Sequence, residues 1–163
     1  IDLPVSQVTK LFGKPAPELT GVVAWKNTDP LTLKDLRGQV VLIDFWSYAC
    51  SICHHYKPDL IRLADRYKGR GVTVITLHDN SVASVEEMDR YMEPVVKSTF
   101  HGKPPGLPIG IDGKGSKSVF QAFGVHAVPT VLLIDRDGKV VRRFAHAGDP
   151  DLEAEVAKLL ERK

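Results

Sequence analysis

The 163-residue sequence contains only two cysteines, Cys50 and Cys53, and no apolar run long enough for a membrane helix. A membrane helix needs about 18 to 20 consecutive apolar residues. Secreted scaffolds held together by disulfides carry more cysteines, spread along the chain. A disulfide between residues so close in sequence closes a very short loop and removes little entropy from the unfolded chain. We therefore expect the pair to serve chemistry and not the stability of the fold.

The sequence also lacks a strong charge of either sign. Its formal net charge of +2 is spread along the chain. The densest basic stretch, Lys139 with Arg142 and Arg143, is short and lies on an alternating strand pattern. Neither nucleic acid nor an anionic membrane surface is therefore expected as a partner. There is no internal repeat or low-complexity segment, and the length fits one compact domain.

The hydrophobic pattern predicts alternating strands and helices. Nearly unbroken apolar runs indicate buried strands, and apolar residues at helical spacing indicate helices. Strands are expected at 40–46, 72–77, 131–134 and 139–144. Helices are expected as a short turn at 31–36, from the cysteines to about 67, from 85 to 92–96, at 116–123 and from 150 onward. The Pro- and Gly-rich residues 99–110 are expected to form a loop. This order predicts an α/β fold with a mixed central β-sheet flanked by helices: parallel crossovers first and an antiparallel hairpin last.

The two cysteines are predicted to lie between a buried strand and the start of a helix. A helix N-terminus presents unpaired N–H groups and a partial positive charge, which stabilise a thiolate. The thiolate is the nucleophile in disulfide exchange. We expect Cys50, nearer the helix start, to attack a partner's disulfide and form a mixed disulfide. Cys53, one helical turn deeper, is expected to resolve it.

Asp44 is a carboxylate within an otherwise apolar strand, six residues before Cys50. A carboxylate is costly to bury unless it is paired. We favour a buried acid that shuttles a proton to and from Cys53. The alternative is an aspartate at a strand end, partly exposed to water.

Two histidines follow the second cysteine directly. We expect both His54 and His55 to be solvent-facing helix residues. The alternative is that a protonated His54 stabilises the Cys50 thiolate.

The segment VVLIDFWSYACSIC resembles the active-site segment of thioredoxin-like proteins, especially the TlpA, ResA and DipZ branch of the AhpC/TSA–redoxin superfamily. GKPAPEL, LKDLRGQVVLIDFW and GVHAVPTVLLIDRDGKVV are similar to the framework of that branch. The resemblance covers about residues 13–160. It implies a thioredoxin fold with a TlpA-like N-terminal extension and a central insertion. Residues 1–12 are then a lead-in segment and 13–163 the thioredoxin-like domain.

The resemblance also implies which residues surround the cysteines. The Val128–Pro129 peptide bond is expected to be cis and to face them. The backbone beside Val128 and Thr130 is expected to receive a partner's extended peptide. Trp46 and Tyr48 are expected to shape the contact surface.

The chain departs from the family at two places near the cysteines. The family often has Pro between or beside its cysteines, whereas this chain has Ser51 and Ile52. That dipeptide tunes the redox balance, so the reduction potential stays open. Many TlpA-like members also lack an acid at the position of Asp44.

The function that the resemblance implies is exchange of electrons with cysteine pairs of other proteins. Reduction of substrate disulfides outside the cytoplasm is expected, in the periplasm or on a membrane tether, with cytochrome c maturation as one pathway. A membrane electron donor of the CcdA or DsbD kind would restore the dithiol. No tightly bound cofactor is needed, and a monomer is expected. The sequence begins with Ile1, which we interpret as removal of an upstream signal peptide or anchor, or as a chosen starting point.

Two binding functions compete with this interpretation. CSICH fits the C-x-x-C-H pattern of c-type haem attachment, with His54 as an axial ligand. Its place after a buried strand argues against haem. Capture of Cu(I) or Zn²⁺ by the two cysteines and His126 is a further hypothesis. Copper-delivery proteins of the thioredoxin fold usually space their cysteines CxxxC, unlike this chain.

A thiol peroxidase is the third alternative. Residues 47–50 echo the S/T-x-x-C pattern of peroxiredoxins. The proline that this motif carries further upstream is replaced by Ile43. Protein disulfide exchange is therefore favoured over peroxidase activity.

Overall fold

Strand β2 (Val40–Trp46) occupies an inner position of a mixed sheet, and each of its seven residues is buried. The computed structural model describes residues 6–162. Within them the sheet has six strands in the order β1-β4-β3-β2-β5-β6. The other strands are β1 (Val22–Lys26), β3 (Val72–His78), β4 (Ile109–Asp112), β5 (Thr130–Ile134) and β6 (Val140–Phe144). The helices are α1 (Ser51–Arg66), α2 (Val85–Thr99), α3 (Val119–Ala122) and α4 (Pro150–Glu161), with short 3-10 helices η1 (Gln7–Leu11) and η2 (Gly115–Lys117).

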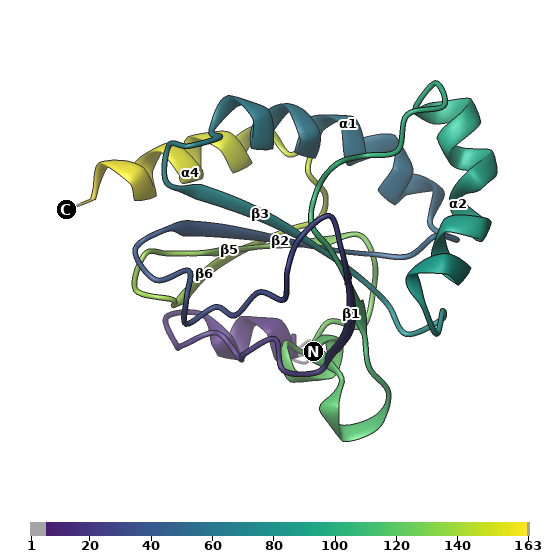
Figure 1. Cartoon of the computed structure of the whole chain (residues 1–163). Coiled ribbons are helices and arrows are strands. Elements are labelled where there is room, and N and C mark those ends of the chain that lie inside the picture. The colour runs from purple at the N-terminus through teal and green to yellow at the C-terminus, as the bar shows by residue number, and fades with distance from the viewer. Residues whose placement is uncertain (1–5, 163) are drawn as a thin grey trace, which may run out of the picture.

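The pairing of the strands confirms the predicted mixed sheet. β2 runs parallel to β3 and antiparallel to β5, and β3 runs parallel to β4. β5 and β6 form the expected antiparallel hairpin, and β1 pairs antiparallel with β4 at the other edge. α1 and α4 cover one face of the sheet, and η1 and α3 lie on the other (Figure 1).

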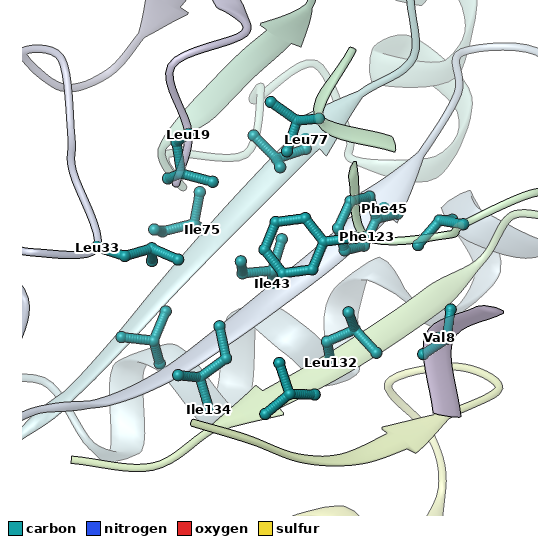
Figure 2. Close-up of a cluster of buried hydrophobic side chains, with 14 residues drawn as sticks. Val8, Leu19, Leu33, Ile43, Phe45, Ile75, Leu77, Phe123, Leu132 and Ile134 are labelled. Carbon is teal, nitrogen blue, oxygen red and sulfur yellow. The ribbon is translucent and has the colours of Figure 1, made fainter. Parts of the chain in front are cut away.

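Alternate residues of β2 point into two separate cores. Ile43 and Phe45 belong to the cluster drawn in Figure 2, together with Phe123 and Val8. Leu42 faces the opposite side, where α1 and α4 pack. Because side chains alternate along a strand, Asp44 and Trp46 share the face of Leu42. That face lies beneath α1, the helix that begins at the cysteines.

Two neighbouring strands on one side of the sheet, β1 and β4, were not predicted from the sequence. β4 begins at Ile109, at the end of the region 99–110 expected to be a loop, and continues to Asp112. β1 was not assigned at all, although its sequence, VVAWK, is mostly apolar. Both strands are short, and short segments give little periodicity. The predicted helical turn at 31–36 was also wrong, because those residues form only turns.

The first described residues contribute to the core. Val8, on η1, is buried against the cluster around Phe123. Part of the segment expected as a lead-in therefore packs onto the domain, and the boundary at residue 13 stays a prediction. Among the described residues, no helix is both long enough and apolar enough to cross a bilayer.

Gly124 fixes the contact between α3 and η1, and replacing it by Ala should destabilise the protein. Its φ is +67°, and an added Cβ would lie 2.9 Å from the backbone carbonyl carbon of Gln7. Gly102 has a similar φ of +81° but faces open space, so it serves as the control. We expect Gly102→Ala to lower the free energy of unfolding by about 1 to 2 kcal/mol, the cost of a left-handed conformation. Gly124→Ala should cost about 1 to 3 kcal/mol more through overpacking. Urea unfolding measures both, and equal losses would contradict the close contact.

Candidate active site

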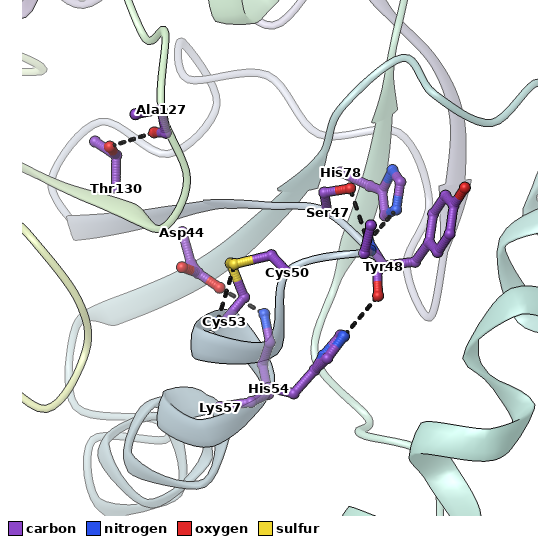
Figure 3. The surroundings of a disulfide bond; sticks show 11 residues. Asp44, Ser47, Tyr48, Cys50, Cys53, His54, Lys57, His78, Ala127 and Thr130 are labelled. Atoms are coloured by element: carbon purple, nitrogen blue, oxygen red, sulfur yellow. Dashed lines mark hydrogen bonds and ion pairs between the residues drawn. A yellow bond between two sulfur atoms is a disulfide. The ribbon is translucent and has the colours of Figure 1, made fainter.

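Cys50 and Cys53 form a disulfide at the N-terminus of α1 (Figure 3). Cys50 is the N-cap residue, and its Sγ accepts a hydrogen bond from the Cys53 N–H at 3.1 Å. Cys50 is partly exposed, whereas Cys53 is only 3% exposed. An approaching partner therefore meets Cys50 first, and Cys53 lies behind it.

A buried ion pair lies beneath the helix face that carries Cys53. The Lys57 Nζ lies 2.5 Å from an Asp44 carboxylate oxygen, and both residues are 5% exposed. Lys57 follows Cys53 by four residues, so the two share one face of α1. Asp44 points toward that same face from β2. Asp44 is therefore buried, as the apolar residues around it in the sequence predict. Its ion-pair partner, Lys57, was not identified from the sequence.

Lys57 and Trp46 form a second contact under the disulfide. The Lys57 Nζ lies 4.4 Å from the centre of the Trp46 ring, a cation–π distance. Trp46 is only 2% exposed. The Trp46 ring therefore supports the site by packing, and it is too deeply buried to contact a partner directly.

Tyr48 lies in the loop between β2 and α1. Its ring stacks between those of Tyr91, from α2, and His78, at centroid distances of 4.6 and 5.8 Å. Tyr48 is half-buried and Tyr91 is exposed. α2 thus places an aromatic residue next to the loop that carries Cys50, a contribution that the sequence did not indicate.

His54 is buried, so the prediction that both histidines face solvent was wrong for this residue. Its Nε2 lies 2.7 Å from the Tyr48 carbonyl oxygen, to which the protonated ring nitrogen donates. Burial lowers the pKa of His54 below its ordinary value of 6.5. The hydrogen bond to Tyr48 acts in the opposite direction, and the charge of the neighbouring Lys57 lowers the pKa further. A neutral ring is therefore favoured, which disfavours the alternative of a protonated His54. His55 is exposed as predicted.

The loop before β5 lies beside the cysteines. The Val128–Pro129 peptide bond is cis, and Val128 packs against the cluster that contains Cys53. β5 begins at Thr130, which pairs with Phe45 of β2. The Thr130 hydroxyl donates to the Ala127 carbonyl at 2.8 Å, and its side chain is buried. Thr130 therefore shapes the loop from inside.

The structure also bears on the metal-binding hypothesis. Over residues 6–162, no three His, Cys, Asp or Glu side chains come together in a way that would hold a metal ion. His126, the histidine named for that role, is exposed.

Stability is expected to fall as the pH drops below about 6.5. Burial is the largest cause that lowers the pKa of both His54 and His78 from the ordinary 6.5. Below pH 6.5 the unfolded chain therefore binds more protons than the folded protein. The contribution of the neutral rings is complete above pH 6.5 and is lost as the pH falls toward the folded-state pKa values. Urea unfolding at pH 7.5 and 5.5 checks this. A double variant, His54→Gln with His78→Gln, should show a smaller loss; an equal loss would contradict it.

The disulfide lies at the N-terminus of the helix that follows an inner strand of this mixed sheet. This arrangement is typical of one class of protein, the thioredoxin-fold thiol-disulfide oxidoreductases. Comparisons with known proteins agree. Residues 12–160 match the Redoxin family. Thiol-disulfide oxidoreductase ResA of Bacillus thuringiensis is 35% identical over 133 residues, 82% of this chain and 69% of that protein. The thioredoxin domain of a thiol-disulfide oxidoreductase from Bacteroides vulgatus superposes with a TM-score of 0.70 at 25% identity, over 92% of this chain and 98% of that one.

A plant relative shows that such a unit also occurs within a far longer protein. The chloroplastic Protein SUPPRESSOR OF QUENCHING 1 of Arabidopsis thaliana is 32% identical over 146 residues. These cover 88% of this chain but only 13% of that protein. The chain belongs to the Redoxin family, in its ResA-like branch, and is an enzyme that exchanges thiols and disulfides. The predicted branch, fold class and enzyme class are confirmed.

Proposed function

We propose that this enzyme reduces disulfides in other proteins outside the cytoplasm. The candidate pathway is cytochrome c maturation, and a membrane electron donor of the CcdA or DsbD kind restores the dithiol. The observation that carries the exchange reaction is the Asp44–Lys57 pair under the face of α1 that bears Cys53, and the reducing direction is the one that the family resemblance favours. A buried thiol must lose its proton before it can attack, and a carboxylate beneath it offers a proton acceptor.

The reaction proceeds through two exchanges. The Cys50 thiolate attacks one sulfur of the substrate disulfide, and the other substrate sulfur leaves as a thiolate that takes a proton from solvent. Cys53 then gives its proton to Asp44 and attacks the Cys50 sulfur. This releases the second substrate thiolate, which takes a proton from solvent, while Asp44 returns its proton to solvent. The substrate gains two electrons and two protons, and the enzyme is left as the Cys50–Cys53 disulfide seen here.

Each neighbouring residue has a proposed part in this sequence. The N–H of Cys53, which bonds to the Cys50 sulfur, stabilises the attacking thiolate and the later leaving group. Lys57 holds Asp44 in place. Val128 and Pro129 line the approach to Cys50 and offer backbone groups to an extended substrate segment. Tyr48 contributes the partly exposed surface next to Cys50.

A redox titration tests the proposed direction. The Cys50–Cys53 pair is equilibrated with dithiothreitol or glutathione buffers and quenched with an alkylating reagent. We expect a two-electron transition at about −250 mV or lower, the thioredoxin end of the range. A transition near −120 mV, where oxidants of this fold lie, would contradict the reducing role.

A further inference from the structure

The loop that carries Cys50, residues 47–50, is held by two histidine side chains (Figure 3). The Tyr48 N–H donates to the His78 Nε2 at 2.9 Å, and the Tyr48 carbonyl accepts from the His54 Nε2 at 2.7 Å. His78 is the last residue of β3 and is 0% exposed; His54 lies on α1 and is 7% exposed. The backbone N–H and the backbone carbonyl of Tyr48 are thus each bound by a buried histidine ring, and the two rings come from different elements.

The partners determine the proton positions on the two rings. The Tyr48 N–H can only donate, so the His78 Nε2 carries a lone pair and its Nδ1 carries the proton. That Nδ1–H donates to the Asp79 carbonyl at 2.8 Å. The Tyr48 carbonyl can only accept, so the His54 Nε2 carries the proton. The two rings are therefore opposite tautomers, and a second proton on His78 would remove the acceptor that Tyr48 needs.

We propose that His54 and His78 are positioning residues for disulfide exchange: by holding the Tyr48 peptide they keep the Cys50 sulfur at the N-terminus of α1. The stabilisation of a thiolate there falls off within one helical turn and depends on the hydrogen bond from the Cys53 N–H. The only residue between Tyr48 and Cys50 is Ala49, which is exposed. The two hydrogen bonds to Tyr48 therefore restrain the position of Cys50, which is only two peptide bonds away. This inference rests on the proposal that Cys50 is the attacking thiol.

The surroundings of the rings keep them neutral. Asp79 has a carboxylate oxygen 3.3 Å from the His78 Nδ1, and this negative charge favours the protonated form of His78. Lys57 disfavours a positive charge on either ring, and His54 also disfavours one on His78. The Trp46 ring packs edge-on against both histidine rings, and the Tyr48 ring stacks on that of His78. Burial outweighs Asp79, so the pKa of His78 is lowered and the ring can accept from Tyr48 at neutral pH.

Paired substitutions test the role of each hydrogen bond. In His78→Gln the amide oxygen reaches the position of Nε2 and can still accept from Tyr48, whereas His78→Asn reaches only the position of Nδ1. His54→Gln likewise keeps a donor for the Tyr48 carbonyl, and His54→Leu removes it. The readout is the rate at which iodoacetamide modifies Cys50 in the reduced protein as a function of pH, with the modified residue located by mass spectrometry.

We expect His78→Asn and His54→Leu to raise the midpoint of the Cys50 pH profile by about one unit. This corresponds to about a tenfold slower modification at a pH below the midpoint. The two Gln variants should stay close to the wild type. His55→Gln, which removes an exposed ring from the same end of α1, controls for loss of a titratable group near the helix terminus and should leave the profile unchanged.

Two results would overturn the inference. One is a wild-type Cys50 profile in folded His78→Asn and His54→Leu protein; the other is an equal shift in the Gln variants, which would implicate ring packing and not the hydrogen bonds. Circular dichroism establishes folding, and if one histidine's variants fail to fold, the pair at the other histidine decides. The proposed function fails separately, through activity that survives Cys50→Ser.

Discussion

Replacing Cys50 by Ser should lower disulfide-reducing activity by about three orders of magnitude or more, because the other thiol, Cys53, is buried and cannot reach a partner's disulfide. Cys53→Ser should also stop turnover, but after the first exchange. Cys50 remains able to attack, and the mixed disulfide then has no resolving thiol. Reduction of insulin disulfides measures the loss of turnover in both variants.

The two variants differ in what they capture. Cys53→Ser should accumulate covalent adducts with disulfide-containing proteins that run as larger species on non-reducing gels and disappear with reductant. Cys50→Ser, its matched control, should form none because the remaining thiol is buried. Adducts on Cys50→Ser, or activity retained by it, would show that the order of attack assigned to the two cysteines is wrong.

The elements that position the disulfide were predictable because each carries a strong local signal. β2 is a run of mostly apolar residues, and α2 is preceded by Ser84, whose side chain caps the helix by accepting from the Glu87 N–H. Asp149 caps α4 in the same way. By contrast, β1 owes its strand conformation to pairing with β4, more than 80 positions away, and β4 also pairs with the distant β3. No local window contains that information.

The active site was predictable to a similar degree. Asp44 stood out because an acid interrupts an apolar strand. Lys57 did not, since a lysine on an amphipathic helix usually faces water. Only the rotation of α1 above β2 shows that Lys57 points at Asp44. His78 ends a buried strand, and its bond to Tyr48 depends on how the loop after β2 folds back against β3. Both residues are thus products of tertiary packing.

Lys57→Met should lower the free energy of unfolding by about 3 to 5 kcal/mol at pH 7, since it leaves the Asp44 carboxylate buried without its partner. Replacing both members of the pair, as in Asp44→Leu with Lys57→Met, should recover most of this loss because an apolar pair of similar size has no desolvation cost. Urea unfolding measures both variants. Lys97→Met provides the control: it breaks the exposed pair with Glu93 and should not change stability measurably.

The double variant also separates the structural role of the pair from its role in proton transfer. With stability restored, the only function missing is a proton acceptor for Cys53. The first exchange at Cys50 should then keep its rate, while resolution of the mixed disulfide slows by about a hundredfold, the typical contribution of a general base. Rapid-quench measurement of the mixed disulfide resolves the two steps. Resolution at the wild-type rate in a folded double variant would mean that Asp44 and Lys57 only support the fold, and that Cys53 loses its proton directly to solvent.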